Sequence, residues 1–290
     1  MDSVLKESKL IQSFDGEDLY YEKRGEGSPL VFCYGIGCLF NHWTPQIRHF
    51  SKRHETLMYD YRGHHKTPIP QNKESLTIEA LAQDAIFLCD QLGYKKATFI
   101  SHSFGGQILL QAYKLRPDLF KHLIFINGCY RNPFAHLADP ETLVEGINQI
   151  KKVYNSAPEL FANLWEWGVN NPLFYPLSAL TGGFNLAKTS FKDIEIYLRG
   201  MSSLDVRVFI TFFEQMIAFD AEDTLSKITA PTLIISGSKD GITPKEEQER
   251  MNELMPNSEI YVVPYGSHCT QLDFPEMVNL KIEQFLVANK

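Results

Sequence analysis

The stretch from residue 97 to residue 113 (ATFISHSFGGQILLQAY) constrains the fold of this chain more than any other. Residues 97–101 are β-prone and mostly apolar, as in a buried strand. Residues 107–113 carry apolar side chains at helical spacing. Small residues crowd the turn between them, because a strand that reverses abruptly into a helix leaves little room for side chains. Ser103 stands at the apex, where the positive end of the helix dipole favours developing negative charge.

Strand-like and helix-like segments alternate along most of the chain. Short apolar segments with strand character lie at residues 29–34, 55–60, 122–127, 231–236 and 260–263. Helical patterns follow them at residues 41–50, 76–92, 244–255 and 274–288. Residues 8–24 indicate two further strands joined at Asp15-Gly16, a dipeptide typical of hairpins. Strands that alternate with helices predict a parallel sheet with helices on both faces.

The alternation stops between residues 131 and 219. This segment shows no convincing strand, only helix-like or loop-like pieces rich in large apolar side chains. We therefore expect an α/β core formed by residues 1–130 and 220–290, with residues 131–219 inserted as a helical lid. The aromatic side chains of the lid could line a substrate cavity, but for most of them packing against the core is favoured.

Composition excludes several classes of function. The net charge of −7 argues against a nucleic-acid partner, because phosphate binding needs a basic surface. Five scattered cysteines show neither metal-ligand spacing nor a disulfide framework. The chain begins without a basic segment followed by an apolar run, and no stretch is long and apolar enough to span a bilayer. We therefore expect a globular cytoplasmic protein with a small-molecule substrate and no membrane span, and we leave a homodimer open.

The small-x-Ser-x-Gly pattern at residues 101–105 resembles the nucleophile elbow of the α/β-hydrolase fold. Ser101 replaces the usual first glycine with another small residue. The resemblance covers nearly the whole chain outside residues 131–219. It implies an α/β fold with a mostly parallel eight-stranded sheet, helices on both faces and an inserted helical lid. It also implies that Ser103 is the nucleophile.

The resemblance also implies the partners of Ser103, since the family order is serine, acid and histidine, each after a later strand. Residues 237–244 (GSKDGITP) resemble the family's Gly-x-x-Asp-x-x-x-Pro loop and select Asp240. Residues 264–268 fit the family's histidine loop and select His268. Asp240 would hold His268 in the correct tautomer, and His268 would take the proton of Ser103.

Acyl transfer also needs two N–H donors directed at the developing oxyanion. The resemblance assigns one to the backbone of Phe104 and the other to Ile36, in a loop where the family usually has His-Gly-x. Tyr34 replaces that histidine in this chain. Residues 60–65 (DYRGHH) resemble the family's Asp-x-Arg-Gly-x-Gly turn, and we expect a structural role in which Asp60 accepts hydrogen bonds from nearby backbone donors.

Other sites are disfavoured. Some relatives carry the acid after the strand before the lid, but Asn127 and Gly128 stand there without a carboxylate. His64 and His65 have no carboxylate or cysteine at ligand spacing, so we expect no metal. The glycines of residues 34–37 lack the third glycine of a dinucleotide-binding loop. We therefore expect catalysis without a cofactor or a metal.

Together these features predict a serine hydrolase that cleaves a small to medium apolar carboxylic ester through an acyl-enzyme. The same triad serves in perhydrolases, C–C bond hydrolases, lactonases and thioesterases of this fold, and the sequence leaves these alternatives open. Ser103 argues against epoxide hydrolases and haloalkane dehalogenases, whose nucleophile is an aspartate. A small-molecule receptor of the same fold is an alternative of a different class.

Overall fold

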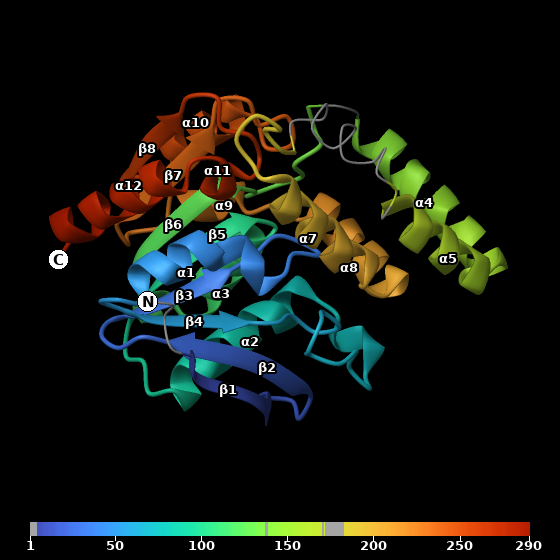
Figure 1. Cartoon of the computed structure of the whole chain (residues 1–290), viewed down its shortest axis with the longest axis horizontal. Helices are drawn as coiled ribbons and strands as arrows, with labels where there is room; N and C mark the ends of the chain where they lie inside the picture. The colour runs from blue at the N-terminus through green and yellow to red at the C-terminus, as the bar shows by residue number, and fades with distance from the viewer. Residues whose placement is uncertain (1–4, 137–138, 170, 172–182) are drawn as a thin grey trace.

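The computed structural model describes residues 5–136, 139–169, 171 and 183–290. Eight strands form one sheet in the order β1-β2-β4-β3-β5-β6-β7-β8 (Figure 1). The strands are β1 Leu5–Gln12, β2 Asp18–Arg24, β3 Pro29–Cys33, β4 Glu55–Tyr59, β5 Ala97–Ser103, β6 Phe120–Gly128, β7 Thr232–Gly237 and β8 Ser258–Val263. Strand β2 pairs antiparallel with β1 and β4, and all the other neighbouring strands are parallel. The mostly parallel eight-stranded sheet predicted from the sequence is confirmed.

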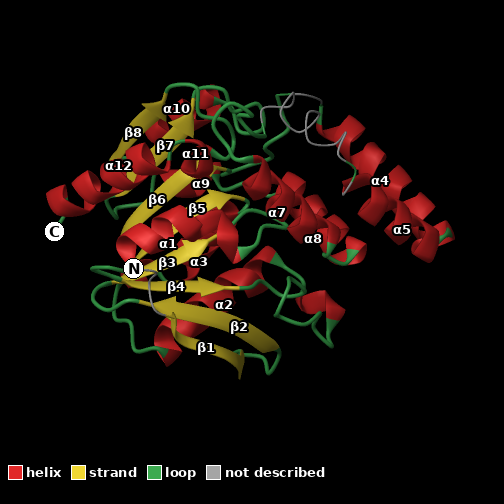
Figure 2. Cartoon of the chain, in the orientation of Figure 1, coloured by secondary structure: helices red, strands yellow, loops and turns green. Residues whose placement is uncertain are grey.

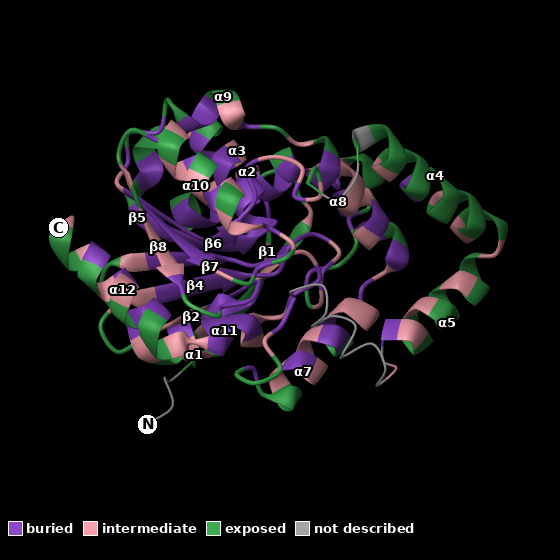
Figure 3. Ribbon diagram, turned by 90° about the horizontal axis from the view of Figure 1, so that it is seen from above, coloured by how far each residue is buried: buried purple, intermediate pink, exposed green. Residues whose placement is uncertain are grey.

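Helices flank the sheet on both sides (Figure 2). Figure 3 shows α2, α3 and α10 on one face and α1, α11 and α12 on the other. The helices are α1 Thr44–Phe50, α2 Ile78–Gln91, α3 Gly105–Leu115, α4 Pro140–Ser156, α5 Pro158–Val169, α7 Phe191–Ser202, α8 Val206–Ala218, α9 Glu222–Leu225, α10 Lys245–Leu254, α11 Thr270–Asp273 and α12 Pro275–Ala288. Among the described residues, no helix is both long and apolar enough to cross a bilayer.

Burial explains the strand pattern. Every residue of β5 is buried, because this strand lies between β3 and β6 with helices on both faces. A continuous apolar run is therefore what its position requires. Strand β1, at the edge of the sheet, has no fully buried residue. Its largely polar sequence, with two lysines, fits that position.

The helices predicted from residues 41, 76, 244 and 274 begin slightly later in the structure, at residues 44, 78, 245 and 275. The helix predicted from residue 76 begins at Ile78, because the Thr77 side chain accepts a hydrogen bond from Ala80 N–H and caps it. The helix predicted over residues 41–50 is a short 3₁₀ turn, η1 Phe40–Trp43, followed by α1.

The chain between β6 and β7 contributes only helices to the described structure, namely α4, α5, α7, α8 and α9. Helices α4 and α5 extend away from the sheet and expose much of their surface (Figures 1 and 3). Parts of the expected lid lie outside the described residues, at positions 137–138, 170 and 172–182. The division into core and lid stays a prediction.

This inserted segment packs on the core in two places. Phe212 of α8 is fully buried, with its ring 5.8 Å from that of Phe104. Leu198 of α7 packs with Cys269 and Leu272, which follow the loop of the predicted catalytic histidine. At least one aromatic side chain of the segment thus serves packing, the role favoured above for most of them.

The turn after β4 is held by a buried arginine. The guanidinium of Arg62 is about 1% exposed and makes paired hydrogen bonds with Asp84 of α2, at 2.8 Å each. It makes a second pair with Asp15 in the hairpin turn, at 2.6 and 3.0 Å. Burial raises the pKa of the Asp84 carboxyl, and Arg62 opposes that rise. Arg62 therefore joins the hairpin, the turn and α2, which is a structural role.

We expect Asp84→Ala to lower the free energy of unfolding by about 3–5 kcal/mol, because it removes one partner of a buried charge. Asp90→Ala is the matched control on the same helix, since Asp90 pairs with the partly exposed Arg116. Its loss should stay below about 1 kcal/mol. Urea denaturation measures both. Similar small losses in the two variants would contradict the role given to Arg62.

Candidate active site

The predicted nucleophile occupies a sharp strand-to-helix turn. Ser103 is the last residue of β5, and its φ of +51° lies in the left-handed region that strains a residue with a side chain. Phe104 is already helical, and α3 begins at Gly105. A Cβ on Gly105 would lie 2.5 Å from the carbonyl oxygen of Cys33, so only glycine lets α3 start so close to β3. The predicted elbow is thus present in the backbone.

The elbow tolerates its unusual first residue. Ser101 is fully buried, and its hydroxyl donates to the carbonyl oxygen of Ile124 on the neighbouring strand β6, at 3.4 Å. The hydroxymethyl group therefore fits where the family usually has glycine, with a partner for its polar atom.

The predicted acid and base are hydrogen bonded to each other. Nδ1–H of His268, in the loop after β8, donates to Oδ2 of Asp240, in the loop after β7, at 2.9 Å. The Asp240 carboxylate also accepts from the N–H groups of Ile242 and Thr243, at 2.8 and 2.9 Å, and from the Thr243 hydroxyl at 2.7 Å. Both side chains are buried. In the neutral imidazole, this hydrogen bond places the proton on Nδ1 and leaves Nε2 without one, as the predicted role of a base requires.

Ser103 joins this pair through its neighbour in the chain. Nε2–H of His102 donates to the carbonyl oxygen of His268 at 2.9 Å, and the two rings are 4.7 Å apart. Among the described contacts, the hydroxyl of Ser103 and Nε2 of His268 make no hydrogen bond with each other. The structure therefore brings the three loops together at the carboxyl edge of the sheet, and among the described hydrogen bonds one joins Asp240 to His268 directly.

A residue that the sequence analysis did not assign connects these loops. Asn127, buried near the end of β6, accepts a hydrogen bond from Gly237 N–H at 2.8 Å. Its Nδ2 donates toward the carbonyl oxygens of Ser267 and His268, at 3.0 and 2.7 Å. Asn127 therefore holds the acid loop and the histidine loop in one arrangement. The sequence signal that could have indicated this role is a polar amide at the end of a predicted buried strand.

Tyr34 has a clear bracing role in place of the family's histidine. Its hydroxyl donates to Oδ1 of Asp60 at 3.0 Å and accepts from Tyr61 N–H at 3.1 Å. The Tyr61 hydroxyl donates back to the carbonyl oxygen of Tyr34 at 2.8 Å. Asp60 also accepts from Lys66 N–H, as predicted, at 3.2 Å. Burial raises the pKa of the Asp60 carboxyl to about 7.

The loop after β3 passes beside the nucleophile. A Cβ on Gly35 would lie 3.3 Å from Cβ of Ser103, so the main chain at Gly35 is in contact with the elbow. Ile36 is the next residue along this loop. Phe104 directly follows Ser103 and precedes the first turn of α3, whose N–H groups have no partner within the helix. Their role as oxyanion donors stays a prediction.

His64 supports the same loop in its neutral form. Its Nε2 accepts from Gly37 N–H at 3.4 Å, while its Nδ1–H donates to the carbonyl oxygen of Arg62 at 3.2 Å. Burial lowers the pKa of His64 to about 3. The imidazole therefore stays uncharged in the folded protein at pH values where it would be protonated in the unfolded chain.

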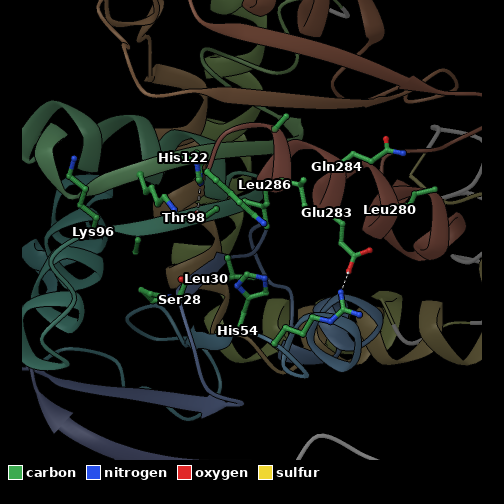
Figure 4. A pocket seen from close by; sticks show the side chains of 17 residues that line it. Ser28, Leu30, His54, Lys96, Thr98, His122, Leu280, Glu283, Gln284 and Leu286 are labelled. Carbon is green, nitrogen blue, oxygen red and sulfur yellow. Dashed lines mark hydrogen bonds and ion pairs between the residues drawn. The ribbon is translucent and has the colours of Figure 1, made fainter.

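A cavity of about 710 Å³ lies far from these residues (Figure 4). It opens between the amino ends of β3 and β5 and helix α12, and its lining includes Leu30, Thr98, His122 and Glu283. Parallel strands present their carboxyl ends at the opposite edge of the sheet, where Ser103, Asp240 and His268 are located. This cavity is therefore separate from the candidate active site.

The pH dependence of stability should reveal the neutral His64. Because its folded pKa is lowered, its contribution to stability is present above about pH 6.5 and is lost as the pH falls toward 3. We expect wild type to lose about 1.4 kcal/mol more than His64→Gln between pH 7.5 and 5.5. Urea denaturation of both proteins at the two pH values measures this. The same loss in both would contradict a neutral His64.

We expect Asn127→Ala to lower the free energy of unfolding by at least about 2 kcal/mol, because it leaves the buried N–H of Gly237 without a partner. The NMR signal of the His268 Nδ1 proton should broaden as the two loops lose their common anchor. Asn257→Ala is the control, since its exposed amide makes one bond, to the Thr229 carbonyl oxygen at 3.1 Å. An unchanged NMR signal in Asn127→Ala would overturn the connecting role.

The chain is similar to known proteins over nearly its whole length. RutD of Stutzerimonas stutzeri (strain A1501), provisionally named a carbamate hydrolase, is 26% identical over 265 residues, which are 90% of this chain and 94% of RutD. The (E)-2-((N-methylformamido)methylene)succinate hydrolase of Acinetobacter baylyi is 25% identical over 283 residues, covering 96% of this chain and 98% of that protein. The solved structure of a thermophilic esterase from Thermogutta terrifontis matches with a TM-score of 0.76 at 22% identity, covering 98% and 99% of the two chains.

A family model decides the classification. The model of the alpha/beta hydrolase fold matches residues 28–275, from just before β3 to the first residue of α12. This range includes the elbow, both loops that follow β7 and β8, and the inserted helices. The chain therefore belongs to the alpha/beta hydrolase fold family.

Proposed function

We propose that the protein is a serine hydrolase that cleaves a small to medium apolar carboxylic ester. The observation that carries this proposal is the hydrogen-bonded Asp240–His268 pair at the sheet edge where the strained Ser103 ends β5. A serine hydroxyl is a weak nucleophile, so it needs a base that a third group holds in place. The hydrogen bond between Asp240 and His268 supports giving these roles to the two residues.

The reaction follows from these roles. Nε2 of His268 takes the proton of Ser103 as its oxygen attacks the ester carbonyl, and the N–H groups of Ile36 and Phe104 stabilise the oxyanion. His268 then returns the proton to the leaving alcohol, which produces the acyl-enzyme. Water activated by the same imidazole releases the acid. No cofactor or metal takes part in this sequence.

The surroundings of the base favour an apolar substrate. Cys269 and Leu272 follow His268 and form an apolar cluster with side chains of the inserted segment, including Phe184 and Leu198. We propose that residues 131–219 act as a lid over the site. An apolar acyl or alcohol group would then be drawn from water into this region.

Carbamate hydrolysis is the second candidate, because the relative RutD is named as a carbamate hydrolase. The alignment with this chain covers 94% of RutD. The same triad chemistry applies to a carbamate carbonyl. The nitrogen lone pair makes that carbonyl less electrophilic than an ester carbonyl. A matched ester and carbamate with the same alcohol therefore separate the two functions, and a higher kcat/KM for the carbamate would replace the ester proposal.

We expect Ser103→Ala to reduce hydrolysis of 4-nitrophenyl butyrate by about 10⁴-fold or more and to abolish labelling by a fluorophosphonate probe. Ser101→Gly is the matched control in the same elbow, and it should keep both properties. Turnover that survives in Ser103→Ala would exclude this nucleophile. Neither turnover nor labelling in wild type would favour a small-molecule receptor.

A further inference from the structure

Three side chains with metal-binding atoms lie beside the candidate active site. Cys38 in the loop after β3, His42 in η1 and His102 in the elbow are buried. The sulfur and one nitrogen of each imidazole lie within 4.8 Å of one another. The position that a Cβ would take on Gly35 is 3.1 Å from Nδ1 of His102 and 3.3 Å from Sγ of Cys38. These two atoms thus face the same small space next to the main chain.

Each imidazole is held by one nitrogen and leaves the other without a partner. Nε2–H of His102 donates to the carbonyl oxygen of His268. Nε2 of His42 lies next to the amide nitrogen of Gln271, whose Oε1 has no partner among the described residues. With this amide turned by 180°, Nε2–H of His42 donates to Oε1 and Nδ1 is left unprotonated. Nδ1 of both rings has no hydrogen-bond partner among the described residues, although both side chains are about 1% exposed. Metal-binding histidines commonly show this pattern, in which one ring N–H donates to an acceptor oxygen and the other nitrogen binds the metal.

A donor set of one thiol and two imidazoles suits Zn²⁺, which prefers sulfur and nitrogen ligands. The catalytic steps proposed above use neither Cys38 nor His42.

We propose that Cys38, His42 and His102 form a binding site for Zn²⁺ whose occupation inhibits the enzyme. Three atoms at most 4.8 Å apart surround a point no more than about 2.8 Å from each, so the ligand atoms need to move inward by less than about 1 Å to reach Zn²⁺ bonding distances. The Cys38 thiol loses its proton to solvent as the Zn–S bond forms, and water completes the coordination.

Inhibition follows from where the cation would stand. The ring of His102 is 4.7 Å from that of His268, so a cation bound to His102 opposes the positive charge that His268 must acquire as a base. Cys38 N–H donates to the carbonyl oxygen of Gly35 at 3.1 Å. Movement of Cys38 toward the metal would therefore displace the loop that carries Ile36. Only this inhibitory effect rests on the proposed function, whereas binding of the cation does not.

Cobalt titration of the metal-free full chain tests the binding itself. We expect one equivalent of Co²⁺ to produce a thiolate-to-cobalt charge-transfer band in the near ultraviolet, and Zn²⁺ to abolish it. The band should be absent in Cys38→Ala and unchanged in Cys89→Ala, a control that removes a buried thiol on α2. His42→Gln should weaken Co²⁺ binding by about 10-fold or more. This second variant tests the site even if Cys38→Ala does not fold.

No band in wild type, or a band that persists in Cys38→Ala, would overturn the site. Zn²⁺ inhibition of 4-nitrophenyl butyrate hydrolysis is the second readout, and Cys38→Ala should raise the inhibitory concentration by about 10-fold or more. The cobalt spectra decide on the cation site even if the protein hydrolyses no ester. Failure of the proposed function is therefore distinguishable from failure of the cation site.

Discussion

The arrangement of the site depends on the close approach of α3 to the end of β3. This approach exists because Gly105 has no Cβ, which would otherwise meet the carbonyl oxygen of Cys33 at 2.5 Å. With α3 so close, the chain must turn within the two residues Ser103 and Phe104, and Ser103 takes a positive φ. The strain is offset by the packing of β5 and α3 on all sides, since every residue of β5 is buried.

The loops around this elbow are joined by side chains that both donate and accept hydrogen bonds. Asn127 accepts from Gly237 N–H and donates to the carbonyl oxygen of His268. A carboxylate at the same position could not donate, so it would repel the carbonyl oxygens that the amide binds. The need to donate to these carbonyl oxygens therefore explains why an amide rather than an acid stands at the end of β6 in this chain. Asn127 serves the loop that contains Asp240 rather than replacing its carboxylate.

Departures from the family pattern are explained by local partners. Ser101 finds a carbonyl oxygen on β6, and Tyr34 connects Asp60 to the backbone of Tyr61. In both cases a larger polar side chain occupies a buried position because a partner stands within hydrogen-bonding reach. Such pairs join segments that are far apart in the sequence, and each residue alone gives no indication of its partner.

The sequence by itself determined the eight strands, most of the helices and the order of the motif-bearing loops, because hydrophobic period and turn residues are local properties. It missed α11, a single turn after His268 that is too short for a period. Only the tertiary structure decided which distant groups meet, such as Arg62 with Asp15 and Asp84. These contacts depend on strand order and register, which bring residues together across the sheet and leave no periodic trace in the chain.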